Sequence, residues 1–253
     1  MINASVHSDK YVFRRSLVIA LGFVFLLWFI RALEDSLTVD LGVWGILPRS
    51  ISGLVGIFTA PLIHGSAFHL LSNTFPLLML LVAVFYFYDE IAAEVFAWIY
   101  VATGFWVWVI ARQAYHIGSS GLVYGLAAFL FFSGIFRKDA RSIAVSLVIA
   151  FIHGGMLQGL FPTESSVSWE SHLLGSAAGI FCSFYFRKTP TSIEDEVDVA
   201  LPSVEEIQTH DHTFSKKAFF VTEVNYHFKK SGKEERRMSY DIRLEKDERD
   251  LLL

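Results

Sequence analysis

The sequence predicts an all-α, polytopic membrane protein with six transmembrane helices, and two observations carry that prediction. Of its 253 residues 53% are hydrophobic and only 18% are charged, and its mean hydropathy is +0.46. Soluble domains carry about 25% charged residues. The second observation is a series of six apolar runs, since a helix that crosses a hydrocarbon core of roughly 30 Å needs about 20 mostly apolar residues.

The predicted spans occupy most of residues 12–186. They cover roughly Val12–Ile30, Phe68–Tyr88, Ile91–Ile110, Ser120–Phe136, Ser142–Leu160 and His172–Phe186. Lys10, Arg14 and Arg15 lie just before and at the start of the first span, and no small-residue cleavage site comes after it. We therefore expect a retained signal anchor and not a removed signal peptide.

The basic residues predict the orientation of these spans. With the N-terminus in the cytoplasm, the inner flanks hold eight Lys and Arg residues and the outer loops hold three. Such an excess on the inner side is typical of membrane proteins, so we expect both termini to be cytoplasmic. The inner residues are Lys10, Arg14, Arg15, Arg137, Lys138, Arg141, Arg187 and Lys188, and the outer ones are Arg31, Arg49 and Arg112.

Polar side chains begin every second span. In this topology the second, fourth and sixth spans run from outside to inside, and their first turns hold His69 with Asn73, Ser120, and His172 respectively. At about 1.5 Å per residue the fourth and sixth spans rise only roughly 25 Å and 22 Å. Both fall short of a core of roughly 30 Å, so we expect Ser120 and His172 to lie below the outer surface in a water-filled depression.

Two pairs of glycines favour close contact between the fourth and sixth spans. Gly121 and Gly125 are four residues apart, and so are Gly175 and Gly179. Small residues at this spacing let helix backbones approach closely. The spacing can serve packing alone, but the same approach would bring Ser120 to His172.

The remaining segments carry no predicted chemistry. The loop 31–67 contains Trp44 and several apolar residues, and we expect it to lie partly in the outer leaflet.

Residues 1–188 form the predicted membrane domain, with 11 basic and 10 acidic residues and no basic stripe for nucleic acid. The tail, residues 189–253, has 10 basic and 15 acidic residues and one semi-alternating stretch near Phe219–Phe228. We expect it to be cytoplasmic and either largely disordered or a small added unit. The single cysteine, Cys182, excludes a disulfide within the chain.

A serine and a histidine on facing helix ends are typical of nucleophilic catalysis. A serine hydroxyl is a weak nucleophile until a base takes its proton, and His172 is the base that the topology offers to Ser120. No Asp or Glu lies in the six runs at that level, so we expect a dyad without an acidic member. Tyr124, one turn after Ser120, could orient the imidazole. His69, Asn73 and the backbone N–H of Ser120 could stabilise an oxyanion.

Each of these residues also has a structural interpretation. A lone serine in a membrane helix more often bonds its own backbone, and a lone histidine or asparagine can serve packing. Several ionisable or polar groups at one membrane level favour function, however. We expect no metal, because the chain has no His-Glu-x-x-His pattern, and no cofactor. We expect His64 to brace the first loop, and His116 and His153 to be structural.

Three motifs in order resemble the rhomboid intramembrane serine proteases. They are His64–Asn73 (HGSAFHLLSN), Gly118–Gly121 (GSSG) with Tyr124, and His172–Gly175 (HLLG) with Gly179. The resemblance covers roughly residues 10–188. It implies a six-helix rhomboid-like bundle in which Ser120 is the nucleophile and His172 the base. It also implies that His69 and Asn73 are oxyanion donors and that Tyr124 packs on His172. The Trp-Arg pair common in the family is separated here, as Trp44 and Arg49.

The resemblance implies an endopeptidase that cleaves single-span membrane proteins. Its substrates would reach the dyad laterally by the fifth span and the loop Gly159–Ser171. We expect a multi-pass protein of a prokaryotic inner membrane, with no nucleic-acid partner. Two other functions stay open: a rhomboid-like pseudoprotease that binds transmembrane helices without cutting them, and a transporter. The natural substrate and the oligomeric state do not follow from the sequence.

Overall fold

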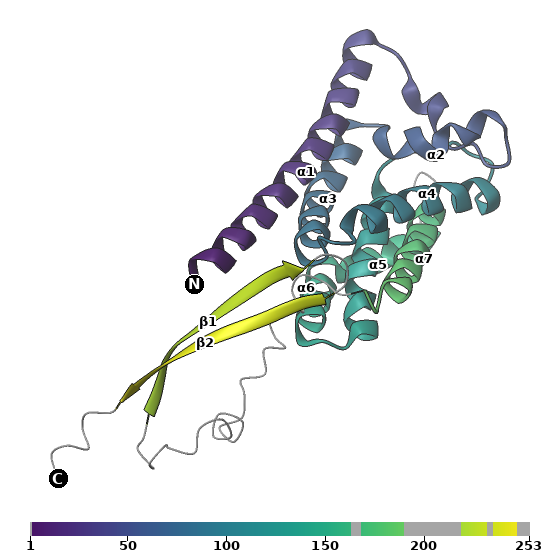
Figure 1. The fold of residues 1–253 in the computed structure, drawn as a ribbon. Helices are drawn as coiled ribbons and strands as arrows, with labels where there is room; N and C mark the ends of the chain where they lie inside the picture. Colours follow the sequence, from purple (N-terminus) through teal and green to yellow (C-terminus); the bar gives the residue numbers. More distant parts are fainter. Residues whose placement is uncertain (1, 163–167, 190–218, 232–234, 247–253) are drawn as a thin grey trace. The chain divides into compact units, whose positions relative to one another are not determined.

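The chain was analysed as a computed structural model that describes residues 2–162, 168–189, 219–231 and 235–246. It divides into two compact units, one of residues 7–198 and one of residues 1–6 with 199–253. The first unit is a bundle of α-helices that the sequence predicts as the membrane domain (Figure 1). Its elements are α1 (Ile2–Leu37), η1 (Leu41–Trp44), η2 (Ser52–Leu54), α2 (Gly56–Thr59), η3 (Ala60–Leu62), α3 (Ala67–Phe87), α4 (Ala92–Ile110), α5 (Ser120–Arg137), α6 (Ala140–His153), η4 (Gly154–Leu160) and α7 (Trp169–Tyr185).

The outer surface of the bundle is rich in exposed apolar side chains, as in proteins that are surrounded by lipid. Among the described residues, four helices are long and apolar enough to cross a membrane: residues Lys10–Leu37 of α1, and α3, α4 and α5. Large apolar side chains such as Phe25, Phe75 and Phe151 point outward and are 69%, 63% and 91% exposed. Soluble monomers rarely expose apolar surface on this scale, whereas a bilayer covers it. The protein is therefore a multi-pass membrane protein, and the predicted all-α polytopic fold is confirmed.

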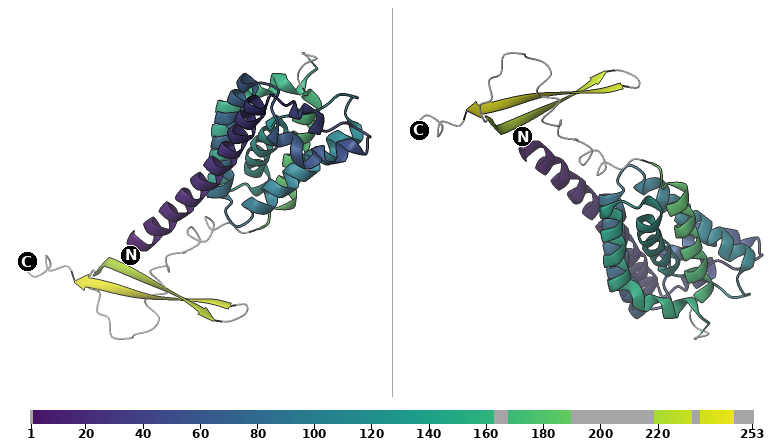
Figure 2. Two further views of the ribbon diagram at one scale, coloured as in Figure 1. Left: turned by 90° about the horizontal axis from the view of Figure 1, so that it is seen from above. Right: turned by 90° about the horizontal axis from the view of Figure 1, so that it is seen from below.

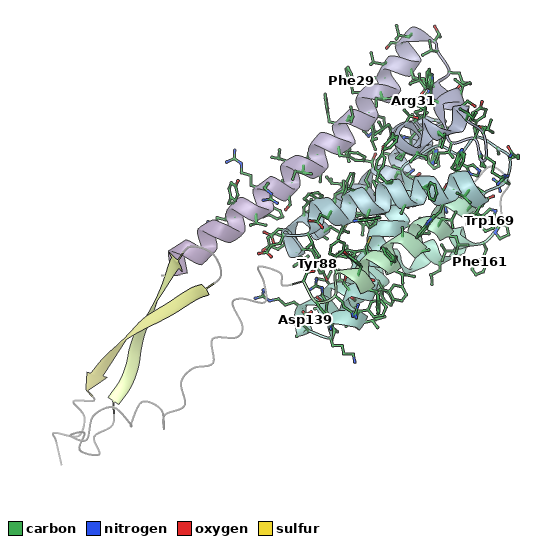
Figure 3. The ribbon with its side chains drawn as sticks, turned by 45° about the vertical axis from the view of Figure 1, so that its right-hand side comes forward. Phe29, Arg31, Tyr88, Asp139, Phe161 and Trp169 are labelled. Carbon is green, nitrogen blue, oxygen red and sulfur yellow. The ribbon has the colours of Figure 1, made fainter. Side chains whose placement is uncertain are left out.

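Helix α5 lies in the interior of the bundle, with α7 packed along it (Figures 1 and 2). Its residues Leu126, Phe129 and Leu130 are completely buried. Helix α1 joins the same core through α3, where the indole N–H of Trp28 donates to Thr74 Oγ1 at 3.0 Å. At one end of the bundle Tyr88 and Asp139 lie close together, with Arg31 towards the other end (Figure 3). Helix α5 is therefore part of the buried core of the bundle.

Helix ends in the bundle follow local sequence signals. Ser66 caps α3 by accepting the N–H of His69 at 3.0 Å, and Asp139 caps α6 by accepting the N–H of Ser142 at 2.7 Å. Helix α6 stops at His153, where the sequence predicts one span to Leu160, and η4 continues in its place. Gly154 and Gly155 begin η4, and glycine is among the poorest helix formers. Helix α1 is likewise longer than the predicted Val12–Ile30.

The three arginines predicted on the outer side each have a structural partner. Arg31 donates to the carbonyl of His64 at 2.9 Å and pairs with Glu34. Arg49 donates to the carbonyls of Val109 and Ala111, so it satisfies the C-terminal end of α4. Arg112 pairs with Glu170 at 3.4 Å. The first loop and the start of α7 are therefore tied to the ends of the long helices.

The second unit contains a two-stranded antiparallel hairpin. Strand β1 (Phe219–Ser231) pairs with β2 (Glu235–Lys246), with an irregularity between Val221 and Glu223. These strands lie in the tail, which the sequence predicts to be either largely disordered or a small added unit, and the rest of the tail lies outside the described residues. The semi-alternating stretch near residues 219–228 is where the pairing occurs, since alternation of apolar and polar residues is typical of strands.

Candidate active site

Ser120 is the first residue of α5, and the chain reaches it through a tightly held turn. Gly118 donates its N–H to the carbonyl of Ala60 at 2.9 Å and has a φ of +106°. A Cβ atom at this position would lie 2.7 Å from Cε1 of His69, so the turn needs glycine for its backbone angle and for the histidine packed on it. As the first residue of a helix, Ser120 has a backbone N–H without an acceptor in the helix.

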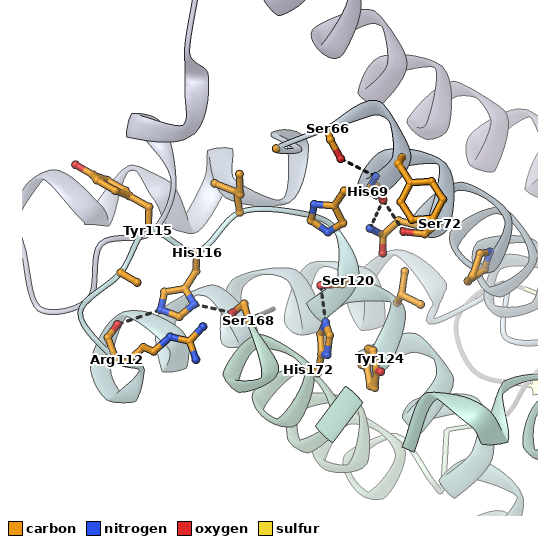
Figure 4. Close-up of a pocket in the computed structure, with 17 residues that line it drawn as sticks. Ser66, His69, Ser72, Arg112, Tyr115, His116, Ser120, Tyr124, Ser168 and His172 are labelled. Atoms are coloured by element: carbon orange, nitrogen blue, oxygen red, sulfur yellow. Dashed lines mark hydrogen bonds between the residues drawn. The ribbon is translucent and has the colours of Figure 1, made fainter. Parts of the chain in front are cut away.

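His172 lies in the first turn of α7 and contacts Ser120 directly. The distance from its Nε2 to Ser120 Oγ is 2.8 Å, and the distance from its Nδ1 to the carbonyl oxygen of Gly159 is 2.9 Å (Figure 4). Because a carbonyl oxygen can only accept, Nδ1 carries the proton and Nε2 presents its lone pair. The Ser120 hydroxyl therefore donates to His172, which is the arrangement that a general base needs.

Two further contacts hold the imidazole ring in place. The ring of Tyr124 stacks on it with a centroid distance of 4.1 Å and an angle of 6° between the planes. Gly159 of η4 completes the enclosure, because a Cβ atom there would overlap the Tyr124 hydroxyl and lie 3.1 Å from His172 Nδ1. Stacking on one face and a hydrogen bond at one edge together fix both the position and the tautomer of His172.

Backbone contact between α5 and α7 brings the two residues together. A Cβ atom at Gly175 would overlap the carbonyl oxygen of Gly121, and one at Gly179 would overlap the carbonyl oxygen of Gly125. The four glycines Gly121, Gly125, Gly175 and Gly179 thus lie along one helix contact. Any side chain at Gly175 or Gly179 would push α7 away from α5 and lengthen the distance between Ser120 and His172.

His69 and Asn73 of α3 border the same cavity as Ser120, Tyr124 and His172, and its volume is about 670 Å³. The Asn73 side-chain amide donates to the carbonyl of His69 at 2.9 Å, which uses one of its two hydrogens. No Asp or Glu is among the described residues that line this cavity. The nearest carboxylate on α7, Glu170, pairs with Arg112. The site therefore presents a serine and histidine pair without an acidic member, facing a wall with polar donors.

A second serine and histidine pair lies beside the first. Ser119 Oγ is 3.1 Å from Nε2 of His64, and the N–H of Ser119 donates to the same nitrogen at 3.2 Å. Ser119 is 0% and His64 1% exposed, and neither lines the cavity. Burial lowers the pKa of His64 to about 4, so its ring is neutral at ordinary pH. The pair joins the first loop to the serine turn, and Ser119 presents no exposed surface to a substrate.

Two features of the site were not predicted from the sequence. The carbonyl of Gly159 has no sequence signal, because every residue carries a carbonyl and only the fold decides which one meets His172. The Ser119–His64 contact also depends on the fold, although the bracing role expected for His64 points towards it. The location of His116, which we expect from the sequence to be structural, is a separate observation: it is among the residues that line the cavity.

Comparisons with known proteins identify the family. The family model for the rhomboid domain matches residues 52–189, which include every site residue described above. The uncharacterized proteins Rv1337 of Mycobacterium tuberculosis and Mb1372 of Mycobacterium bovis are each 35% identical to the chain over 173 residues, covering 65% of the chain and 72% of the relative. The uncharacterized protein ML1171 of Mycobacterium leprae is 31% identical over 176 residues, covering 66% and 70%. The chain belongs to the rhomboid family.

Proposed function

We propose that this rhomboid-family protein is an intramembrane serine endopeptidase with a Ser120–His172 dyad. The observation that carries the proposal is the 2.8 Å contact between Ser120 Oγ and His172 Nε2 at the wall of an open cavity. The tautomer of His172 is the one that accepts the serine proton, because its other nitrogen donates to Gly159. A pseudoprotease has no need of both groups in this geometry.

The reaction follows from these groups. Ser120 Oγ attacks the carbonyl carbon of the scissile peptide bond while His172 Nε2 takes the hydroxyl proton. The tetrahedral intermediate collapses with cleavage of the C–N bond, and the imidazolium gives its proton to the leaving amine. A water molecule, deprotonated by the neutral His172, then attacks the acyl-enzyme and releases the second product and free Ser120. The stacked Tyr124 ring keeps the imidazole in position through both steps.

The negative charge that develops on the carbonyl oxygen needs hydrogen-bond donors around it. The backbone N–H of Ser120 is one, since it lies at the positive end of α5. His69 and Asn73 would supply side-chain donors from α3, and both line the cavity. Preorganised donors of this kind stabilise the transition state more than the substrate, and the loss of one typically costs about 10²–10³ in rate.

The proposed substrates are single-span membrane proteins. A cavity among apolar helices is reached most directly by a segment that is itself in the bilayer, and the cut requires that segment to be locally unwound. We further propose a bacterial inner membrane, with both termini cytoplasmic and the dyad near the outer surface. The bacterial relatives support the choice of a bacterial membrane. The eight basic residues predicted on the inner side support the orientation.

Cleavage by the purified protein tests the proposal. A panel of single-span substrates with helix-destabilising residues near one end of the span would be incubated with wild type, Ser120→Ala and Ser119→Ala. Ser119 is the matched control, because it is the neighbouring serine and bonds another histidine. We expect cleavage by wild type and Ser119→Ala and none by Ser120→Ala.

Two other outcomes would favour other functions. Substrate binding without cleavage, together with no labelling of wild type by a serine-reactive phosphonate, would identify a pseudoprotease. Solute flux in liposomes that survives in Ser120→Ala would identify a transporter. Either result would overturn the proposed function.

A further inference from the structure

A second polar cluster lies next to the dyad and joins the loop before α5 to the start of α7. It consists of Arg112, His116, Ser168, Glu170 and Ser171. His116 is only 2% exposed although it is among the residues that line the cavity (Figure 4). None of these residues takes part in the proposed chemistry. Buried polar groups without such a role normally have a structural reason for being retained, and the contacts identify it.

The hydrogen bonds of this cluster have a defined direction. His116 Nε2 lies 3.1 Å from the carbonyl oxygen of Arg112, so this nitrogen must be the donor. In the neutral ring Nδ1 is then an acceptor, and it lies 2.6 Å from Ser168 Oγ. The Ser168 hydroxyl therefore donates to His116, and Ser168 Oγ accepts from the Ser171 hydroxyl at 2.6 Å. Burial lowers the pKa of His116, which keeps the ring in this neutral form.

The cluster ends at the backbone of the catalytic base. The carbonyl of Ser168 accepts the N–H of Ser171 at 3.1 Å and that of His172 at 3.4 Å. At the other end, the backbone of His116 forms two hydrogen bonds with Ile46, at 2.9 and 3.0 Å. The ring of His116 thus connects a fixed loop to the residue from which α7 begins. The Arg112–Glu170 ion pair, whose carboxylate is buried, spans the same two segments.

We propose that His116 is a positioning residue for His172, and that its bond to Ser168 holds the first turn of α7 at the correct distance from Ser120. The inference rests on the proposed function for its kinetic consequence. His116 touches neither Ser120 nor His172 through its side chain, so it acts only through Ser168. Small displacements of a catalytic group suffice to slow a reaction, since about 1 Å of misplacement can cost on the order of 10²-fold.

Three substitutions separate this role from a role in the stability of the loop. His116→Asn keeps an oxygen near the position of Nδ1 that can accept from Ser168 and loses the bond to Arg112. His116→Gln keeps a donor near the position of Nε2 for the Arg112 carbonyl and loses the bond to Ser168. Ser168→Ala removes the hydroxyl alone. We expect His116→Gln and Ser168→Ala to lower kcat about 10-fold or more with little change in KM, and His116→Asn to retain more of kcat than either.

Hydrogen exchange provides a readout that does not need activity. The amides of Trp169–Leu173 should exchange faster in His116→Gln and Ser168→Ala than in wild type and His116→Asn.

Equal kcat and equal exchange in His116→Gln and wild type would overturn the inference and leave the proposed function intact. Greater retention of kcat by Gln than by Asn would also overturn it, because that order assigns His116 to its own loop. A wild type that neither cleaves nor reacts with a phosphonate would overturn the proposed function, and the exchange rates would still decide the role of His116. If the His116 variants do not fold, kcat and amide exchange are compared among wild type, Ser168→Ala and Ser171→Ala instead.

Discussion

Alanine in place of Gly159 should slow catalysis without unfolding the bundle, because its side chain would enter the space between the tyrosine and the base. The new Cβ atom would overlap the Tyr124 hydroxyl and lie 3.1 Å from His172 Nδ1. Either the stacked pair of rings or the carbonyl of residue 159 must move. Both movements weaken the hydrogen bond that fixes the tautomer of His172.

The expected loss of kcat depends on how much stronger the hydrogen bond from His172 Nδ1 to the Gly159 carbonyl is in the transition state than in the ground state. A hydrogen bond between neutral groups contributes about 0.5–1.5 kcal/mol, and one to a charged group about 1.5–3 kcal/mol. His172 becomes charged only as the serine proton is transferred, so the bond stabilises the transition state over the ground state by about 1–1.5 kcal/mol, which is roughly tenfold in rate. Misplacement of the ring can add up to about another factor of ten. We expect kcat to fall about 10-fold to 100-fold with KM little changed.

The assay measures kcat, KM and melting temperature on the same preparations. Gly154→Ala and Gly155→Ala are the controls, since they lie in the same 3₁₀ segment and a Cβ atom at either would have nothing within 4 Å. Addition of Tyr124→Phe to Gly159→Ala should recover part of kcat, because it removes the hydroxyl that the new methyl group would overlap. A Gly159→Ala protein with the kcat of wild type would refute this account of how the base is held.

Other predictions concern the oxyanion, the buried histidine and the topology. His69→Ala and Asn73→Ala should each lower kcat by up to about 10²-fold and raise KM far less. This loss is at or below the lower end for a lost oxyanion donor, because water enters the cavity. An unchanged kcat in both variants would remove these residues from the mechanism. The fold keeps His64 neutral with a pKa of about 4, whereas the unfolded chain protonates near 6.5. The free energy of unfolding should therefore be highest above about pH 6.5 and should fall by about 3 kcal/mol as the pH drops to about 4. His64→Gln should lose less over this interval, and parallel curves for the two proteins would contradict this assignment. In a Cys182→Ala background, Thr38→Cys should react with an impermeant thiol reagent on intact cells and Lys138→Cys should not, and the reverse pattern would place the dyad on the cytoplasmic side.

The sequence predicts the fold class and the helices well, because those depend on local composition. Apolar runs of membrane length have few alternatives to a spanning helix, and the six predicted spans correspond to α1, α3, α4, α5, α6 with η4, and α7. The ends are less predictable. The break at Gly154 and the start of α7 at Trp169 depend on what the neighbouring helices allow. The pairing of strands in the tail likewise depends on partners distant in sequence.

The candidate site also has a part that could be predicted from the sequence and a part that depends on the fold. Ser120, His172, His69 and Asn73 could be assigned to one membrane level from topology, because spans that run in one direction have their first turns on the same side of the membrane. The group that orients His172 could not be assigned, since it is a backbone oxygen on another segment. Nor could the sequence alone separate Ser119 from Ser120 by burial, as adjacent residues at a helix start differ only in the direction in which each side chain points.

The most direct measurement of the central claim is the site of covalent labelling by a serine-reactive phosphonate, located by mass spectrometry in wild type and in the two serine variants. The account predicts one adduct per chain, on Ser120, which is lost in Ser120→Ala and in His172→Ala and is retained in Ser119→Ala. Labelling that disappears in Ser119→Ala and persists in Ser120→Ala would contradict it, because the reactive pair would then be Ser119 with His64.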